Sequence, residues 1–123
     1  MKTVLIVDDS TTVRQYYREI LSDSGYEVSE AVNGIEALEK TLTSPFDLYL
    51  VDVNMPKMNG YAFLRKLRSE EIPQAPAIMI STEAESQDRD EAFRAGANYY
   101  LVKPTKPETL LKLVRVLLGE LFT

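Results

Sequence analysis

Residues 3–9 read Thr-Val-Leu-Ile-Val-Asp-Asp, a continuous apolar run followed by two aspartates. Three more apolar runs are just as continuous, at residues 48–51, 77–80 and 99–102. Continuous apolarity is typical of strands buried on both faces of a parallel sheet, because neither face meets water. Residues 26–32 instead mix apolar and polar positions, which predicts an exposed edge strand.

Helical patterns fill the segments between these strands. Apolar residues three or four positions apart form four stripes: Val13, Tyr17, Ile20 and Leu21; Ile35, Leu38 and Leu42; Phe63, Leu64 and Leu67; and Leu110, Leu111, Val114, Leu117, Leu118 and Leu121. Such stripes are typical of helices that bury one face, and we expect the last helix to end at about Leu121. The mostly polar segment 85–95 predicts one more helix from a weaker pattern.

The alternation of strands and helices determines the expected fold. Three capping-box pairs predict helix starts: Asn33 with Glu36, Thr82 with Glu85, and Thr105 with Glu108. Strand and helix alternate about five times, which predicts one α/β domain over residues 1–123 with helices on both faces of the sheet. We expect a doubly wound, flavodoxin-like fold whose five-stranded parallel sheet has the order 2-1-3-4-5.

Composition excludes several kinds of chemistry. The chain has no histidine and no cysteine, which removes imidazole catalysis, thiol nucleophiles, disulfides and most zinc sites. Its net charge of −5 argues against DNA as the main partner. The apolar runs are far shorter than the roughly 18 residues of a membrane span. Because there is no signal-peptide layout either, we expect a cytoplasmic protein without membrane insertion.

Polar residues stand at the end of each buried run. Asp8 and Asp9 follow the first run, Asp52 the second, Ser81 the third and Lys103 the fourth. Any one of these residues alone could simply cap a helix. Ligands, however, bind at the carboxyl ends of parallel strands, and in the expected order the first and third strands are neighbours. We therefore expect the three aspartates to meet in one pocket.

A pocket of three carboxylates indicates a metal. Oxygen ligands without histidine or cysteine favour a hard cation, Mg²⁺ or Mn²⁺. An EF-hand that starts at Asp52 is excluded, because Pro56 and Lys57 occupy its fifth and sixth positions. The glycines are too far apart for a glycine-rich nucleotide loop, so we expect no ATP or NAD site.

Taken together, these residues resemble the signature of response-regulator receiver domains. The matching elements, in order along the whole chain, are Asp8-Asp9, Asp52, Met55-Pro56-x-Met58-x-Gly60, Ser81 and Lys103-Pro104. The resemblance implies that a histidine kinase or phosphotransfer protein donates a phosphoryl group to Asp52, the nucleophile. The chain is then a signalling phosphoacceptor and not an enzyme, because it promotes only its own phosphoryl transfer and dephosphorylation.

The resemblance also assigns roles to the other site residues. Asp9, Asp52 and the backbone carbonyl of Asn54 are expected to ligate Mg²⁺, with Mn²⁺ as a substitute, and Asp8 to hold the metal through water. Ser81 and Lys103 are expected to bind phosphoryl oxygens.

Four further expectations concern the switch and its surroundings. Ser81 is preferred to Thr82 as the switch hydroxyl, because Thr82 fits a helix cap. Tyr100 resembles the aromatic residue that turns inward on activation, although ordinary strand packing also explains it, and Tyr99 should face the opposite way. Asn54 and Glu83 are expected to tune hydrolysis. A cis Lys103–Pro104 bond is implied by the resemblance alone.

The expected output is a protein contact. We expect no effector domain after the last helix, and the chain in this respect resembles stand-alone chemotaxis regulators of the CheY type. The fourth helix, fifth strand and fifth helix would bind a downstream target, the flagellar switch or another protein. Val53 in place of the usual tryptophan, and Ser81 in place of the commoner threonine, weaken a specific link to the motor. We expect a monomer, with a dimer on phosphorylation as the alternative.

Three other functions remain open at this point. A phosphorelay intermediate or phosphate sink, which hands its phosphoryl group to another histidine protein, fits nearly as well. A Mg²⁺-dependent phosphatase with an aspartyl nucleophile is disfavoured, because it needs an acid where Asn54 stands and a longer chain for a cap. A scaffold that has lost phosphorylation is disfavoured because every chemical residue is present.

Overall fold

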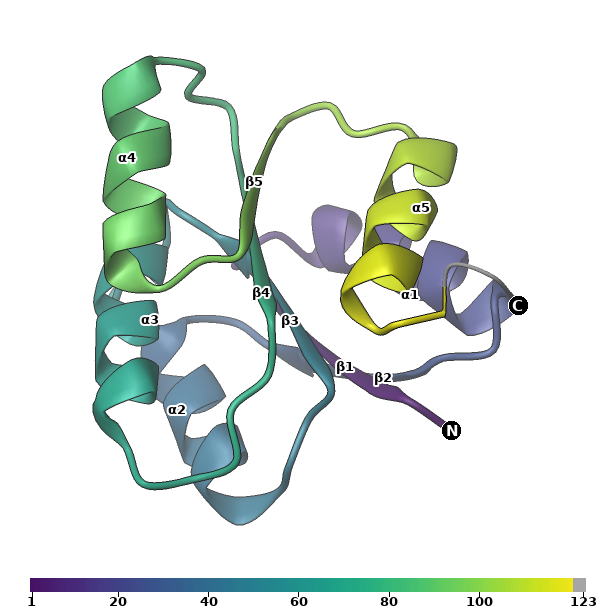
Figure 1. The fold of residues 1–123 in the computed structure, drawn as a ribbon, viewed down its shortest axis with the longest axis horizontal. Coiled ribbons are helices and arrows are strands. Elements are labelled where there is room, and N and C mark those ends of the chain that lie inside the picture. The colour runs from purple at the N-terminus through teal and green to yellow at the C-terminus, as the bar shows by residue number, and fades with distance from the viewer. Residues whose placement is uncertain (121–123) are drawn as a thin grey trace.

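The computed structural model describes residues 1–120 and contains one parallel sheet with the strand order β2-β1-β3-β4-β5 (Figure 1). The strands are β1 (Thr3–Val7), β2 (Glu27–Ala31), β3 (Leu48–Asp52), β4 (Ala77–Ser81) and β5 (Tyr99–Val102). The helices are α1 (Thr11–Asp23), α2 (Gly34–Thr43), α3 (Gly60–Ser69), α4 (Ser86–Ala95) and α5 (Pro107–Leu117). The predicted α/β class and the predicted order 2-1-3-4-5 are confirmed.

Both faces of the sheet are covered, which explains the continuous apolar runs. In Figure 1, α2, α3 and α4 lie on one side of the sheet, and α1 and α5 lie on the other. Successive strand residues point to opposite faces, so Val7 and Val51 pack on the side of α2–α4 while Ile6 and Leu50 pack on the side of α1 and α5. The edge strand β2 is only partly covered, as its mixed pattern predicted.

The buried face of α2 differs from the predicted one. Ile35 and Leu42 are 43% and 51% exposed, whereas the helix buries Gly34, Ala37 and Thr41. The reason is close packing, because a Cβ on Gly34 would lie only 2.7 Å from the carbonyl oxygen of Met58. Small side chains let α2 approach the β3–α3 loop, and the large apolar residues are left facing outward. The stripe prediction was therefore wrong here, although the helix itself is present.

One of the three predicted N-cap residues, Asn33, forms its cap bond. The Asn33 side chain caps α2 by accepting the amide N–H of Glu36 at 2.9 Å. The other two predictions were wrong. Glu85 precedes α4 and makes no side-chain cap bond, because the chain continues past β4 as a loop that leaves Thr82 exposed. Pro107, which suits the first turn of a helix, sets the start of α5 beyond Thr105.

The end of the last helix is also earlier than expected. Among the described residues α5 ends at Leu117, and the predicted end at Leu121 lies outside the described residues. Its predicted stripe does face the sheet, with Leu110 and Val114 fully buried. Within residues 1–120, the structure contains no helix with the length and apolarity that a membrane crossing requires.

An ion-pair cluster joins the edge strand β2 to α1 and to the loop after β1. Glu30 accepts hydrogen bonds from the guanidinium groups of Arg14 and Arg18, one on each carboxylate oxygen. Arg14 also donates to the carbonyl oxygen of Asp8 at 2.7 Å. Burial raises the pKa of Glu30, but the bonds from Arg18 and Arg14 outweigh it, so the pKa lies below its ordinary value.

Replacing Glu30 with glutamine should lower the free energy of unfolding by about 1 kcal/mol at pH 7, since two arginines lose their shared carboxylate. A carboxyl whose pKa is lowered on folding contributes stability above its unfolded pKa and loses it as the pH falls through the folded pKa. The difference between wild type and Glu30→Gln should therefore shrink at about pH 3, as urea denaturation at both pH values would measure.

The matched control for this prediction is Glu27→Gln, an exposed position on the same strand. It should change stability little at either pH. An equal loss for Glu30→Gln at pH 7 and at about pH 3 would contradict the ion-pair explanation.

Candidate functional site

Polar side chains from four neighbouring strands meet at the carboxyl edge of the sheet. Asp52 and Ser81 are the last residues of β3 and β4, and Lys103 directly follows β5. Asp8 and Asp9 follow β1, whose Val7 pairs with Val51 of β3. One carboxylate oxygen from each of Asp8, Asp9 and Asp52 lies within 4.8 Å of the others. The three aspartates therefore meet, as the strand order requires.

Lys103 is placed between two of these carboxylates. Its Nζ lies 3.0 Å from Oδ1 of Asp52 and 3.3 Å from Oδ2 of Asp8. Its amide N–H donates to the carbonyl oxygen of Ser81 at 2.7 Å, which fixes the start of the β5–α5 loop. Burial lowers the pKa of Lys103, but the hydrogen bond and charge of Asp52, with the charge of Asp8, outweigh it and raise the pKa above its ordinary value.

The single ammonium does not neutralise the pocket. Burial raises the pKa of Asp52, the hydrogen bond from Lys103 opposes this, and the charges of Asp8 and Asp9 raise the pKa further. The net result is a pKa above the ordinary value of an aspartate. Ionisation of the buried Asp52 beside two other carboxylates therefore costs free energy, and a bound cation would offset that cost.

The donor set fits a hard divalent cation. Asp9 is exposed, and its carboxylate accepts no hydrogen bond from any residue in the range 1–120 that the structure describes. Asp8 is already engaged, because its Oδ1 accepts the amide N–H of Ser10 at 2.9 Å and its Oδ2 faces Lys103. Mg²⁺ takes one or two carboxylates directly and keeps several waters. The three carboxylates therefore offer the oxygen ligands that a hard divalent cation takes, and the assignment of Asp9 and Asp52 as direct ligands and of Asp8 as a ligand through water stays a prediction.

The β3–α3 loop carries Asn54 beside the aspartates. Asn54 is exposed two residues after Asp52, and the role of its backbone carbonyl as a metal ligand stays a prediction. The β3–α3 loop makes a tight turn. In it, Lys57 adopts a φ of 69°, and the amide N–H of Gly60 donates to the carbonyl oxygen of Val53 at 2.9 Å. A non-glycine residue with positive φ is uncommon and indicates a constrained turn.

Gly60 has a role that the sequence pattern did not explain. A Cβ on this residue would lie 2.3 Å from the carbonyl oxygen of Asp52 and 2.6 Å from Cε of Met79. Glycine is therefore required for α3 to begin directly against the backbone of Asp52. The only sequence signal was that Gly60 belongs to the segment Met55-Pro56-x-Met58-x-Gly60.

Ser81 and Tyr100 both hold the backbone of Glu83, through its N–H and its carbonyl oxygen respectively. The Oγ of Ser81 accepts the amide N–H of Glu83 at 3.1 Å, and the hydroxyl of Tyr100 donates to the carbonyl oxygen of Glu83 at 2.7 Å. Tyr100 is buried, with the guanidinium carbon of Arg89 5.4 Å from its ring centre. Tyr99 is 47% exposed, so the prediction that it faces the opposite way is confirmed.

The remaining residues of the prediction lie at the rim. Glu83 is exposed, with its backbone held as described and its side chain on the surface. The Lys103–Pro104 peptide bond is cis. Sequence reasoning missed Arg14, which supports the carbonyl of Asp8, because an arginine inside a helix carries no signal of a contact with another loop.

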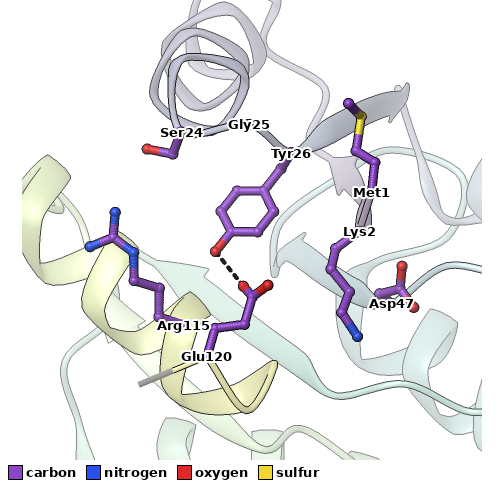
Figure 2. A pocket seen from close by; sticks show the side chains of 8 residues that line it. All are labelled: Met1, Lys2, Ser24, Gly25, Tyr26, Asp47, Arg115 and Glu120. Carbon is purple, nitrogen blue, oxygen red and sulfur yellow. Dashed lines mark hydrogen bonds between the residues drawn. The ribbon is translucent and has the colours of Figure 1, made fainter. Parts of the chain in front are cut away.

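A polar hollow lies away from these aspartates. It has a volume of about 610 Å³ and is lined by Met1, Lys2, Ser24, Gly25, Tyr26, Asp47, Arg115 and Glu120. Figure 2 shows the hydroxyl of Tyr26 pointing to Glu120, to which it donates at 2.8 Å. None of the predicted site residues lines this hollow. The candidate site is therefore the carboxyl edge of the sheet, where the charged groups converge.

Comparison with known proteins gives a consistent result over nearly the whole chain. The family model described as "Response regulator receiver domain" matches residues 4–115. Chemotaxis protein CheY1 of Helicobacter pylori is 41% identical over 119 residues, which cover 94% of this chain and 96% of the relative. A solved structure of the chemotaxis protein CheY4 of Vibrio cholerae has a TM-score of 0.90 at 42% identity, covering 95% of this chain and 98% of the other.

A second kind of relative is longer. Transcriptional regulatory protein ResD of Bacillus subtilis is 36% identical over 115 residues, which cover 94% of this chain and 47% of the relative. The family model's match, residues 4–115, includes the carboxyl ends of all five strands. The similarity therefore extends over the site as well as the fold.

Millimolar Mg²⁺ should raise the melting temperature of the wild type by a few degrees, because a ligand that binds only the folded state stabilises it. The Asp9→Asn variant should lose this shift, since Asp9 is the exposed carboxylate of the cluster. Differential scanning fluorimetry with and without Mg²⁺ measures the effect. Asp90→Asn, an exposed acid on α4, should keep the full shift. A wild type that does not respond to millimolar Mg²⁺ would overturn the metal site.

Asp52→Asn should raise the free energy of unfolding by about 1 kcal/mol at pH 7 without divalent cations, because functional sites commonly trade stability for activity. The substitution removes a buried charge whose pKa is raised by burial and by two like charges. Asp47→Ala makes the opposite control, since the Oδ2 of Asp47 accepts both the N–H and the hydroxyl of Thr3 and loss of this acceptor should destabilise. If the Asp52→Asn variant has a lower free energy of unfolding than the wild type, this account is contradicted.

Proposed function

The chain belongs to the response regulator receiver domain family, and from this premise we propose that it is a CheY-like two-component signalling protein that is phosphorylated on Asp52. One observation carries the assignment: the carboxylate of Asp52 ends a central strand between two other aspartates and the ammonium of Lys103. The alternative of an aspartyl-nucleophile phosphatase gains nothing from this arrangement, because Asn54 offers no acid for a leaving group.

The phosphoryl group comes from a histidine kinase or a phosphotransfer protein. A carboxylate oxygen of Asp52 attacks the phosphorus, the new P–O bond forms, and the P–N bond to the donor histidine breaks with its electron pair on the nitrogen. The nitrogen then takes up a proton. The donor histidine is external to this chain, since the chain itself contains none.

A divalent cation has a defined place in this reaction. Mg²⁺, or Mn²⁺ in its place, would be held by Asp9, Asp52 and the carbonyl of Asn54, with Asp8 acting through water, and would supply positive charge to the phosphoryl oxygens. Asp8 contributes in a second way, because its bonds to Ser10 and Lys103 keep the loop after β1 in place.

Lys103 and Ser81 bind the oxygens of the phosphoryl group on Asp52. Lys103 now pairs with Oδ1 of Asp52 and, when an oxygen of Asp52 becomes part of an acyl phosphate, the ammonium pairs with a phosphoryl oxygen instead. The Oγ of Ser81 uses a lone pair to accept from Glu83, so its own proton remains available for a phosphoryl oxygen. Asn54 and Glu83 stand exposed at the rim, where water for hydrolysis arrives, and we assign them the tuning of that step.

The output surface consists of α4, β5 and α5. Three half-exposed apolar side chains lie on these elements: Phe93 on α4, Tyr99 on β5 and Val116 on α5. A mainly apolar cavity of about 410 Å³ between β5 and α5 includes Tyr99 and Val116. Exposed apolar side chains of this kind favour a protein contact. The target is a downstream protein, the flagellar switch or another. The similarity to chemotaxis proteins favours the flagellar switch.

The signalling role ranks ahead of a pure phosphorelay intermediate or phosphate sink, because a relay needs only the site around Asp52 and leaves the apolar output surface unexplained. Three expectations stay predictions from the sequence: a monomer, its alternative of a dimer on phosphorylation, and a place in the cytoplasm.

Incubation with Mg²⁺ and acetyl phosphate, followed by intact mass measurement, should add one acid-stable and base-labile phosphoryl group to the wild type. Asp52→Asn should take up none, because an amide cannot replace the carboxylate nucleophile. Asp90→Asn should react like wild type and controls for the loss of an exposed acid. Equal uptake by wild type and Asp52→Asn would show that another residue is the acceptor.

A further inference from the structure

The guanidinium of Arg14, in the first turns of α1, is held from three sides beside the candidate site. The side chain is only 12% exposed. Its Nε donates to Oε1 of Glu30 at 2.8 Å, one terminal nitrogen donates to the carbonyl oxygen of Asp8 at 2.7 Å, and the other donates to Oγ1 of Thr11 at 3.3 Å. Because a guanidinium is planar and rigid, bonds from all three of its nitrogens fix its orientation.

The carbonyl that Arg14 binds belongs to the peptide between Asp8 and Asp9. A peptide group is planar, so a bond to this carbonyl also fixes the plane that contains the nitrogen of Asp9. Asp8 has further contacts, since its N–H donates to Ala31 at 3.1 Å and its Oδ1 accepts from Ser10. The exposed carboxylate of Asp9 has no hydrogen-bond donor in the described part of the chain. Its direction therefore depends on the backbone that Arg14 holds.

Glu30 of β2 supplies the counter-charge that lets Arg14 occupy this place. A guanidinium keeps its proton, so an unpaired arginine here would repel a cation held by the aspartates. The carboxylate of Glu30 is shared between Arg14 and Arg18, and Glu30 lies opposite Ile6 near the end of β1. The positive charge of Arg14 is thus offset, and what Arg14 contributes to the site is geometry.

The orientation of Asp9 bears on how tightly a cation binds. A side chain that must be ordered on binding costs free energy, and a backbone that is already in place reduces this cost. In metal sites, groups that orient a ligand without touching the ion typically change the metal affinity by about ten- to a hundredfold when they are removed. Arg14 has the position of such a group, and the proposed reaction gives it no other task.

We propose that Arg14 is a positioning residue of the cation site. By fixing the peptide after Asp8, it directs the carboxylate of Asp9 toward the cation. The inference rests on the proposed function, because it needs a divalent cation at the aspartates. In this role Arg14 is not a ligand and does not contact the phosphoryl group. The edge strand β2, which offers no ligand, then contributes to cation affinity through Glu30.

The test is the affinity for Mg²⁺, measured by titration and two-dimensional amide NMR with no phosphodonor present. Arg14→Lys keeps the charge but replaces the planar fork by a single nitrogen, which loses the geometry that joins Glu30 to Asp8. Its dissociation constant for Mg²⁺ should be about tenfold larger than that of wild type. Arg18→Lys is the matched control, because Arg18 also bonds to Glu30 but makes its other contact with the carbonyl oxygen of Val28. Its affinity should equal that of wild type.

A spectroscopic signature separates positioning from a general loss of stability. The amide nitrogen of Asp9 belongs to the peptide whose carbonyl Arg14 binds. In metal-free protein its chemical shift should therefore change clearly in Arg14→Lys and little in Arg18→Lys, and an unchanged shift in Arg14→Lys would contradict the role of the bond. Urea denaturation should show that both variants lose stability, because both weaken the cluster around Glu30.

Equal Mg²⁺ affinity of wild type and Arg14→Lys, or equal losses of affinity in Arg14→Lys and Arg18→Lys, would overturn the inference and leave the cation site intact. A wild type that does not bind Mg²⁺ would instead overturn the cation site of the proposed function, and the inference with it. Glu30→Gln decides the question if Arg14→Lys does not fold. The amide signal of Asp9 should then shift and the Mg²⁺ affinity should fall several-fold, and no change in either would overturn the inference.

Discussion

Repulsion among three carboxylates is the constraint around which the site is built. Asp8, Asp9 and Asp52 are brought together by the order of the sheet, and only Lys103 compensates them within the described chain. Such a pocket persists because the surrounding contacts fix it: Ser10 and Arg14 hold the loop of Asp8, and the β4–β5 ladder holds the backbone of Lys103. The excess negative charge favours binding of a cation at this pocket, and the proposed phosphoryl transfer to Asp52 depends on that cation.

The molecule divides into a firmly packed part and a loosely attached part. The central strands are buried on both faces, and α3 begins in direct contact with the backbone of Asp52. Helix α4, in contrast, is held by hydroxyls from Tyr61 and Tyr100 and buries only two alanines. This division suits a switch, because elements that move in regulation come from the less stable regions of a protein. The proposed chemistry therefore takes place at a rigid edge, beside a helix that little apolar packing holds.

Much of this arrangement follows from the sequence. The apolar runs, the mixed run at residues 26–32 and the alternation of strands and helices predicted the sheet and its order, and the polar residues at the strand ends predicted the meeting of the aspartates. The outward-facing Ile35 and Leu42, and the uncapped start of α4, were not predictable from periodicity or capping patterns. The face that α2 buries depends on how closely it approaches the β3–α3 loop, which the small Gly34 decides, and the start of α4 depends on the path of the loop after β4. The hydroxyl contact of Tyr61 was missed because residues 27 positions apart in the sequence carry no pattern that relates them.

The two tyrosines beside α4 also give the protein an optical signal of its own. The chain contains seven tyrosines and no tryptophan, so tyrosine is the residue that emits on excitation in the near ultraviolet. Tyrosine emission depends on the hydrogen bonding of the phenol, and the phenols of Tyr61 and Tyr100 are bonded to carbonyls at the two ends of the segment that leads into α4. Movement of α4 is therefore recorded by chromophores that the native sequence already contains, without a label or an introduced tryptophan.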